Sequence, residues 1–382
     1  MSGPRWLYSA RFDLCAFTLP AVGSLLLGAT AGRLALPDGS TPTWAWALLV
    51  LGIDVAHVHG TTVRVYLDPT ELRRRTALYA AVPALALLLG MTAYAASPLL
   101  FWRFLAYVAA AHFVRQQLGW LRLYRRRAGD RSPWDRRLDE ATTYAATLYP
   151  LVAWHARLDG SPGELHWFVA GDFMAGLPPW CAAAAKMAWA ALLVLFLARQ
   201  LWRTARGEPF PAGKVLLVLT TAATWWAGIV LWRNDFAFTV TNVVTHGVPY
   251  MAVSQRVGSP RAEGQPPAPL SSLFAPGRLA PYLAALVGLA WIEEWLWDRT
   301  VWNDHAALFP GPFVEVHGSG LEVLWVPLLA LPQLTHYVLD GYVWRLDGTN
   351  PGLAEALEMA PPGAASLVAS ARPAGARTAD RA

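Results

Sequence analysis

The stretch that decides the fold is ALYAAVPALALLLGMTAYAASP at residues 77–98. It carries no charged side chain, and a helix of this length crosses the roughly 30 Å hydrocarbon core of a bilayer. Comparable apolar runs lie before and after it, at about 12–36, 43–63, 99–121, 140–157, 181–202, 214–232, 236–252, 279–301 and 321–344. The sequence therefore predicts an all-α, polytopic transmembrane bundle of about ten spans.

The composition supports the same fold class. Hydrophobic residues make up 55% of the 382 residues and charged residues only 15%, whereas soluble domains carry about 25% charge. This balance argues against a soluble enzyme, a disordered chain or a disulfide scaffold. Cys15 and Cys181 are the two cysteines, too few for a disulfide framework or a zinc ribbon. Because no GxSxG, Walker A, GxGxxG or CxxC motif occurs, nucleotide binding, serine hydrolysis and thiol redox chemistry have no sequence support.

The basic residues predict the orientation of the bundle. With the N-terminus in the cytoplasm, the cytoplasmic segments hold 24 of the 31 Lys and Arg residues, and the opposite segments hold four. Loops rich in Lys and Arg remain cytoplasmic. The sequence thus predicts that both termini are cytoplasmic, in a bacterial inner membrane. We assign the net charge of +5 to these loops and not to nucleic-acid binding.

The domain organisation is predicted to be simple. Residues 1–349 would form one transmembrane domain, and residues 350–382, rich in Ala, Pro, Gly and Arg, a disordered cytoplasmic tail. The first apolar run follows Arg5 and Arg11, as in a signal peptide. Its length of about 24 residues exceeds the 7–15-residue core of such peptides, which favours a retained helix.

The histidines are the most informative polar residues. Five of the nine lie inside predicted spans, namely His57, His59, His112, His246 and His336. Four of these, each from a different helix, are 10–15 residues from the outer end of the span, a depth of roughly 15–22 Å. Ionisable groups at such a depth are costly and normally face the bundle interior. His57, His112, His246 and His336 are therefore expected to meet at one level, in the cytoplasmic half of the membrane.

Each of these histidines has a polar neighbour at helical spacing. The pairs are Asp54 with His57, His112 with Gln116, Asn242 with His246, and His336 with Asp340. Residues three or four apart share a helix face, so each helix presents a small polar patch. His57 and His59, two residues apart, point to nearly opposite faces. Both would bind one centre only if the helix unwound near Gly60, so one of them would otherwise have a structural or supporting role.

Buried imidazoles and carboxylates at one level predict a metal site. The expected ligands are His57, His112, His246 and His336, with His59 next. Neutral imidazole suits iron, copper or zinc, and iron would allow oxygen chemistry on a lipid-like substrate entering sideways from the membrane. An electron donor would be a further partner. Asp54 and Asp340 would either bind the metal or orient a ligand histidine.

Two further residues beside His112 are expected to contribute to the site. Gln116 would hydrogen-bond a substrate or a ligand histidine, although hydrogen bonding between helices explains it equally well. Arg115, together with Arg64, would bind an anionic headgroup at the inner interface. The simpler interpretation of Arg64 is that it sets the topology.

Four short motifs resemble a known family. They are HVHGTTVRVYLDP at 57–69, HFVRQQLGWLRLY at 112–124, TNVVTHGVPY at 241–250 and THYVLDGYVWR at 335–345. This distribution of single-histidine motifs over several helices resembles membrane-embedded iron oxygenases, in particular the bacteriorhodopsin-related carotene-cleaving proteins. The resemblance implies an iron centre facing the cytoplasmic leaflet and a carotenoid substrate. The clustered HxxxH and HxxHH boxes of fatty acid desaturases are absent.

Other functions fit the same residues. In a proton-coupled transporter the buried histidines and acids would titrate; in a haem protein two of the histidines would be axial ligands; in a structural protein they would form a polar core. A second, outer site is a further hypothesis, built from His155, His166, His305, His317, Glu293 and Glu294.

Overall fold

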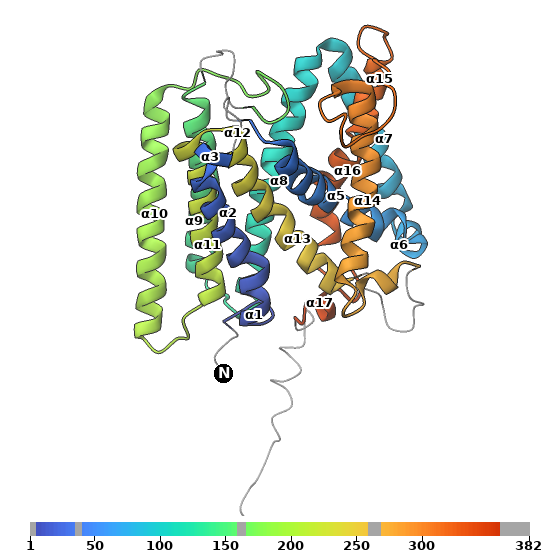
Figure 1. Cartoon of the computed structure of the whole chain (residues 1–382). Coiled ribbons are helices and arrows are strands. Elements are labelled where there is room, and N and C mark those ends of the chain that lie inside the picture. The colour runs from blue at the N-terminus through green and yellow to red at the C-terminus, as the bar shows by residue number, and fades with distance from the viewer. Residues whose placement is uncertain (1–4, 35–39, 159–165, 259–268, 360–382) are drawn as a thin grey trace, which may run out of the picture.

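The structure is a computed structural model of the whole chain, and it describes residues 5–34, 40–158, 166–258 and 269–359 (Figure 1). Helices and the turns that join them account for the described residues, and no strand occurs among them. The predicted all-α class is therefore confirmed.

The first half of the described chain contains helices up to residue 155. They are α1 (Ala10–Asp13), η1 (Leu14–Thr18), α2 (Leu19–Ala29), α3 (Ala31–Leu34), α4 (Thr43–Ala45), η2 (Trp46–Val55), α5 (Ala56–Thr61), η3 (Thr62–Tyr66), α6 (Pro69–Arg74), α7 (Thr76–Ala96), α8 (Pro98–Arg127) and α9 (Pro133–His155).

The second half continues the same pattern. It contains α10 (Pro179–Ala205), α11 (Ala212–Trp225), η4 (Trp226–Trp232), α12 (Asp235–Phe238), η5 (Thr239–Val243), α13 (Val244–Val257), η6 (Ser271–Phe274), α14 (Leu279–Trp297), η7 (Asp298–Trp302), α15 (Glu322–Leu329), α16 (Leu331–Val343) and α17 (Leu353–Ala356). All the η segments except the 3-10 helix η6 are π-helical turns that continue the α-helices beside them.

Six continuous helices are long and apolar enough to cross a membrane. They are Ala10–Ala29, Thr43–Tyr66, Thr76–Ala96, Pro179–Ala205, Ala212–Trp232 and Leu279–Trp302. Helix α10 is the most lipid-like, because only 6% of its most apolar window is buried inside the protein. It stands at the edge of the bundle beside α9 (Figure 1). These helices are consistent with an integral membrane protein.

Four of the ten predicted runs are helical but fall outside this group of six: α8, α9, η5 with α13, and α15 with α16. For α15 and α16 the reason is length, because the helix is interrupted at Ala330 and leaves pieces of 8 and 13 residues; for the others it is polar content. Helix α9 begins with a charged first half, and α8 and α13 carry histidine, glutamine and arginine. Such residues lower the hydropathy of a helix that packs inside the bundle.

The histidine-bearing helices occupy the middle of the molecule. Helices α2, α9, α10 and α11 lie on one side and α7, α14 and α15 on the other, with α5, α8, α13 and α16 between them (Figure 1). Helix α5 packs against α13 and α16, and α8 packs against α16. This arrangement brings residues from far apart in the sequence to one central place.

Two glycines permit close packing at this centre. A Cβ atom on Gly247 would lie 2.5 Å from Cγ2 of Ile53, and one on Gly60 would lie 3.0 Å from Cε1 of Tyr250. Only glycine fits such approaches. Each glycine is a near neighbour of a histidine in the chain, so the glycines allow the helices of His57 and His246 to approach each other closely.

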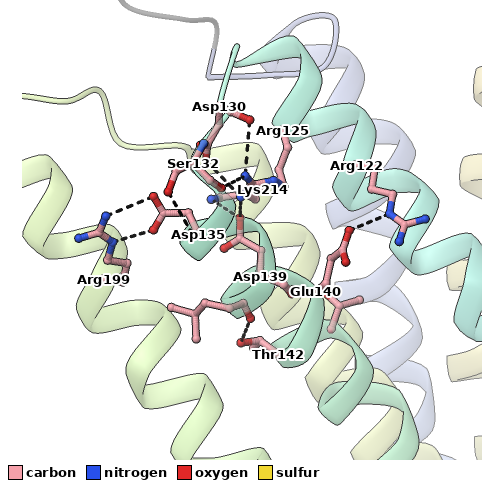
Figure 2. A network of polar contacts seen from close by, with 12 residues as sticks. Arg122, Arg125, Asp130, Ser132, Asp135, Asp139, Glu140, Thr142, Arg199 and Lys214 are labelled. Atoms are coloured by element: carbon pink, nitrogen blue, oxygen red, sulfur yellow. Dashed lines mark hydrogen bonds and ion pairs between the residues drawn. The ribbon is translucent and has the colours of Figure 1, made fainter. Parts of the chain in front are cut away.

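One end of the bundle, which we call the basic end, gathers Arg and Lys side chains from several loops. Figure 2 shows its buried network: Arg125 and Lys214 both pair with Asp139, and Arg199 pairs with Asp135. Nζ of Lys214 lies 2.9 Å from Oδ2 of Asp139, and both side chains are buried. The network ties the ends of α8, α10 and α11 to the start of α9.

The same end also receives residues near the C-terminus of the described chain. Leu353 and Leu357 are buried in the core, and Glu358 pairs with Arg127 and Arg256. The sequence predicts a disordered tail at 350–382. Residues 350–359 of that segment are described and pack against the bundle, whereas residues 360–382 lie outside the described residues.

Candidate metal centre

Four histidines converge in the middle of the bundle. His57 comes from α5, His112 from α8, His246 from α13 and His336 from α16. Each offers one ring nitrogen, and these four nitrogens all lie within 4.8 Å of one another. All four side chains are buried, with His336 fully inaccessible. The predicted convergence of histidines from four separate helices is thus confirmed.

The rings pack tightly around a common point. Nε2 of His57 lies 3.0 Å from Nε2 of His246. The ring centroids of His57 and His336 are 4.9 Å apart, those of His112 and His246 5.1 Å, and those of His112 and His336 4.7 Å. In the described part of the chain, this is the one group of three or more His, Cys, Asp or Glu residues with metal-ligand spacing.

Hydrogen bonds to one nitrogen fix two of the rings. Nδ1 of His57 lies 3.2 Å from the carbonyl oxygen of Ile53, one helical turn earlier, and donates to it as the N–H tautomer requires. Nδ1 of His336 lies 2.8 Å from Oγ1 of Thr61. Holding Nδ1 in this way directs Nε2 to the other histidines, which is the usual arrangement of metal-binding histidine; Nε2 of His57 contacts Nε2 of His246, and Nε2 of His336 has no partner.

His246 is held by its surroundings in a different way. The ring of Phe113 stacks on it, with centroids 3.6 Å apart and an interplanar angle of 8°. Nε2 of Gln116 donates to the backbone carbonyl of His246 over 3.2 Å. Gln116 therefore supports the helix that carries His246, and this contact is the helix-to-helix alternative expected from the sequence.

Several nitrogens of this cluster have no hydrogen-bond partner within the described chain. They are Nε2 of His112, Nδ1 of His246 and Nε2 of His336, and all three are buried. A buried polar atom without a partner costs roughly 1–3 kcal/mol. Three in one place indicate that the group is completed by something that binds to nitrogen.

The donor set fits a transition-metal ion. Metal–imidazole bonds are about 2.0–2.1 Å long, so nitrogens around one ion lie roughly 3–4 Å apart. The observed limit of 4.8 Å needs only small side-chain rotations to reach that spacing. Four neutral imidazoles are a donor set suited to iron, copper or zinc.

The two predicted carboxylates lie beside the cluster. Oδ1 of Asp54 is 3.8 Å from Nδ1 of His57, and Oδ1 of Asp340 is 3.5 Å from Nδ1 of His336. Oδ1 of Asp340 also accepts hydrogen bonds from Thr61 and Tyr250. Both acids approach the nitrogen that faces away from the centre, so they are placed to orient ligands.

His59 lies apart from the four. The helix remains continuous through Gly60, and His59 points to α14, where its Nε2 is 3.1 Å from Oε2 of Glu293. It does not belong to the group of nitrogens within 4.8 Å. A ligand role for His59 therefore stays a prediction without a geometric basis in this structure.

The two arginines differ in their contacts. Arg64 is buried, donates to the carbonyl of Val343 over 3.3 Å and lies over the Trp344 ring at 4.3 Å. Arg115 is exposed, one turn after His112. The two were expected to bind one headgroup together. Arg64 is occupied by protein contacts, and Arg115 remains available.

The outer polar residues are dispersed. His155 bonds with Tyr107 through Nε2 at 2.7 Å, and His305 packs on Trp46 with ring centroids 3.9 Å apart. Burial lowers the pKa of His305. His166 and His317 are exposed, whereas Glu293 and Glu294 are buried in α14. The described residues show no second metal-ligand group on this side.

Sequence reasoning missed three residues that shape the centre: Thr61, Tyr250 and Phe113. Thr61 and Tyr250 each lie four residues after a histidine of the cluster, so they share its helix face. That spacing could have indicated them, but the search along the spans followed ionisable residues, and a hydroxyl group carries no charge. Phe113 had no such signal, because it stacks on a histidine of a different helix.

No protein-family model, curated protein or solved structure matches the chain. The function must therefore be argued from the geometry of this centre.

Proposed function

We propose that the protein is an integral membrane, metal-dependent oxidoreductase that uses iron and acts on a hydrophobic, lipid-like substrate. The observation that carries the proposal is the meeting of four buried imidazoles from four helices: one nitrogen of each ring lies within 4.8 Å of the others, and three ring nitrogens of the group have no hydrogen-bond partner. An arrangement that exists only to lock helices together would pair those nitrogens.

The proposed topology has ten membrane-crossing helices and both termini in the cytoplasm of a bacterial inner membrane. Two observations support it. The basic end collects the Arg-rich segments that the charge bias assigns to the cytoplasm. The polar helices outside the six apolar ones pack against other helices, α8 against α9 and α16, and α13 against α5, as spanning helices with polar residues need to do.

His57, His112, His246 and His336 would hold the metal. Iron, if bound by these imidazoles, would supply the redox chemistry. The chain's own residues do the rest. Phe113 stacks on His246, and Gly60 and Gly247 let the helices around the centre pack closely, while Thr61 and the Ile53 carbonyl fix the ring orientations.

A proton-coupled transporter is the second candidate, and one observation favours it. His59 and Glu293 form a buried pair between α5 and α14, the kind of pair that titrates in a proton path. The haem alternative has the weaker geometry. The four rings lie with centroids 4.6–5.1 Å apart around one point, which leaves no flat slot for a macrocycle.

The test is elemental analysis together with an optical spectrum of the purified full-length protein. The expected result is one iron per chain without the Soret band that haem produces. A Soret band would favour haem, and stoichiometric zinc or copper would replace iron in the proposal. Protein purified without chelator that holds no metal would overturn the metal-dependent function and leave the transporter.

A matched control uses a histidine outside the centre. His155→Ala removes a histidine that also lies in a helix but whose partner is Tyr107. The His155→Ala protein should keep the metal, whereas the His246→Ala protein should lose it. Equal metal content in the two variants would place the ion elsewhere.

A further inference from the structure

The clearest route to the candidate centre runs between α8 and α16. Two grooves, of about 500 Å³ and 470 Å³, meet there. Both are lined by His112, Arg115, Tyr337, Gly341 and Arg345. Volumes of this size are typical of small-molecule sites. His112 is the one histidine of the cluster that lines them, so the grooves lead to that side of the centre.

The charge on the groove walls is strongly one-sided. The larger groove is lined by Arg115, Arg122, Arg126 and Arg345, with Asp340 as its single carboxylate. Asp340 is already engaged by Thr61 and Tyr250. The groove therefore offers a positive wall beside apolar and aromatic side chains.

The four arginines differ in how far they are already satisfied. Arg122 pairs with Glu140 at 2.9 Å. Arg126 donates to the carbonyl of Leu346, and Arg345 donates to that of Gly341. Arg115 has no hydrogen bond or ion pair to any described residue, although it sits closest in sequence to the centre, one turn from His112.

The position of Arg115 makes this lack of a partner meaningful. It lies within the long helix α8, about six residues before the end of the apolar run, roughly 9 Å from the interface. A charged side chain at such a depth is costly and normally has a partner. Space is kept for it across the groove, since a Cβ on Gly341 would lie 3.2 Å from Nη2 of Arg115.

We infer that the groove binds a long-chain lipid with an anionic headgroup, a carboxylate or a phosphate, whose charge pairs with Arg115 and whose chain lies along Tyr337 and His112. The inference rests on the proposed function, because it names the substrate class of the same centre. Arg126 and Arg345, nearer the basic end, widen the positive field that draws the headgroup in. A guanidinium matches a carboxylate or phosphate through two parallel hydrogen bonds.

The test is native mass spectrometry of the full-length protein in detergent, with three added lipids. Oleate and dioleoyl phosphatidic acid carry the two anionic headgroups, and oleyl alcohol has the chain of oleate without the charge. We expect retention of at least one anionic lipid, with oleyl alcohol bound about ten- to a hundred-fold more weakly. Preference between the two anions identifies the headgroup as carboxylate or phosphate. Retention of neither anionic lipid, or retention of oleyl alcohol equal to that of both, would overturn the inference.

Variants tie the effect to one side chain. Arg115→Gln should weaken anionic-lipid binding by the same ten- to a hundred-fold, and Arg115→Lys should restore most of it because the charge remains. Arg103→Gln is the matched control, since Arg103 lies on the same helix but donates to the carbonyl of Gly171. Loss of binding in Arg103→Gln as large as in Arg115→Gln would also overturn the inference. If Arg115→Gln does not fold, the comparison of oleate with oleyl alcohol on the unaltered protein still decides.

Metal content measured on the same samples separates this inference from the proposed function. Iron-loaded protein that does not distinguish oleate from oleyl alcohol would refute the substrate class and keep the oxidoreductase. Metal-free protein that still binds oleate through Arg115 would refute the oxidoreductase and keep the lipid site.

Discussion

Two buried polar clusters of this molecule differ in whether their polar atoms find partners within the protein. At the basic end, Arg125 and Lys214 meet Asp139, and each charge has a partner (Figure 2). In the middle of the bundle, four histidines meet without an acid among them, and three ring nitrogens have no partner. Oδ1 of Asp139 also has no hydrogen-bond partner, but the charges of this cluster balance one another within the protein, whereas the unpaired nitrogens of the neutral rings indicate a ligand.

The largest effect is expected from removing two ligands at once. In His57→Ala/His246→Ala the protein should still elute as a folded species, but iron should fall below about a tenth of the unaltered content, because two of four donors are gone. Elemental analysis after size-exclusion chromatography measures both. Full iron occupancy in the double variant would contradict the four-histidine centre.

At the basic end, a substitution should lower the stability of the protein and leave its iron content unchanged. Asp139→Asn leaves Lys214 buried without a counter-charge and Arg125 with Asp130 alone, so the free energy of unfolding should fall by about 3–5 kcal/mol. Thermal unfolding in detergent measures this loss, and the folded fraction should keep its iron.

The neighbouring residue supplies the control for that experiment. Glu140 pairs with Arg122, whose side chain is 60% exposed, so Glu140→Gln should cost no more than about 1 kcal/mol. Similar losses in Asp139→Asn and Glu140→Gln would show that burial does not set the importance of these pairs.

A smaller effect is expected from Thr61→Val, which keeps the shape of the side chain and removes the hydroxyl that holds Nδ1 of His336. Groups that orient ligand histidines typically contribute 10- to 100-fold to metal affinity. Chelator competition should show a loss of about that size. Unchanged affinity would mean that packing alone orients His336.

The smallest effect on the metal is expected from His59→Gln. His59 faces Glu293 and not the four-histidine centre, so iron content should stay the same within error. A clear loss of iron would return His59 to the ligand set and require the helix to rearrange near Gly60.

Much of this architecture could be predicted from the sequence, and for a physical reason. The length of an apolar run sets whether a helix can cross a bilayer, and the position of a residue along that helix sets its depth. The common depth of His57, His112, His246 and His336 could therefore be inferred from the sequence. The side of each helix that faces the centre could be inferred in part, from polar neighbours three or four residues away.

Contacts between side chains of different helices could not be predicted in this way. Lys214 and Asp139 lie in different helices, and nothing in the local pattern of either indicates the other. Their charges predicted only topology. In the same way the stacking of Phe113 on His246 depends on how α8 and α13 are placed side by side, which periodicity within one helix does not specify.

The π-helical turns affect the direction in which two histidines of the centre point. Segments η2 and η3 flank the helix of His57, and η5 directly precedes that of His246. A π turn holds more residues than an α turn. Winding the same residues, 239–243, as an ordinary α-helix would therefore swing His246 by roughly 100° around the axis, whereas removing one residue there would let the stretch relax and leave His246 pointing in nearly the same direction. The hydrogen-bonding pattern of these turns thus sets the direction of the rings as much as the identity of the residues does.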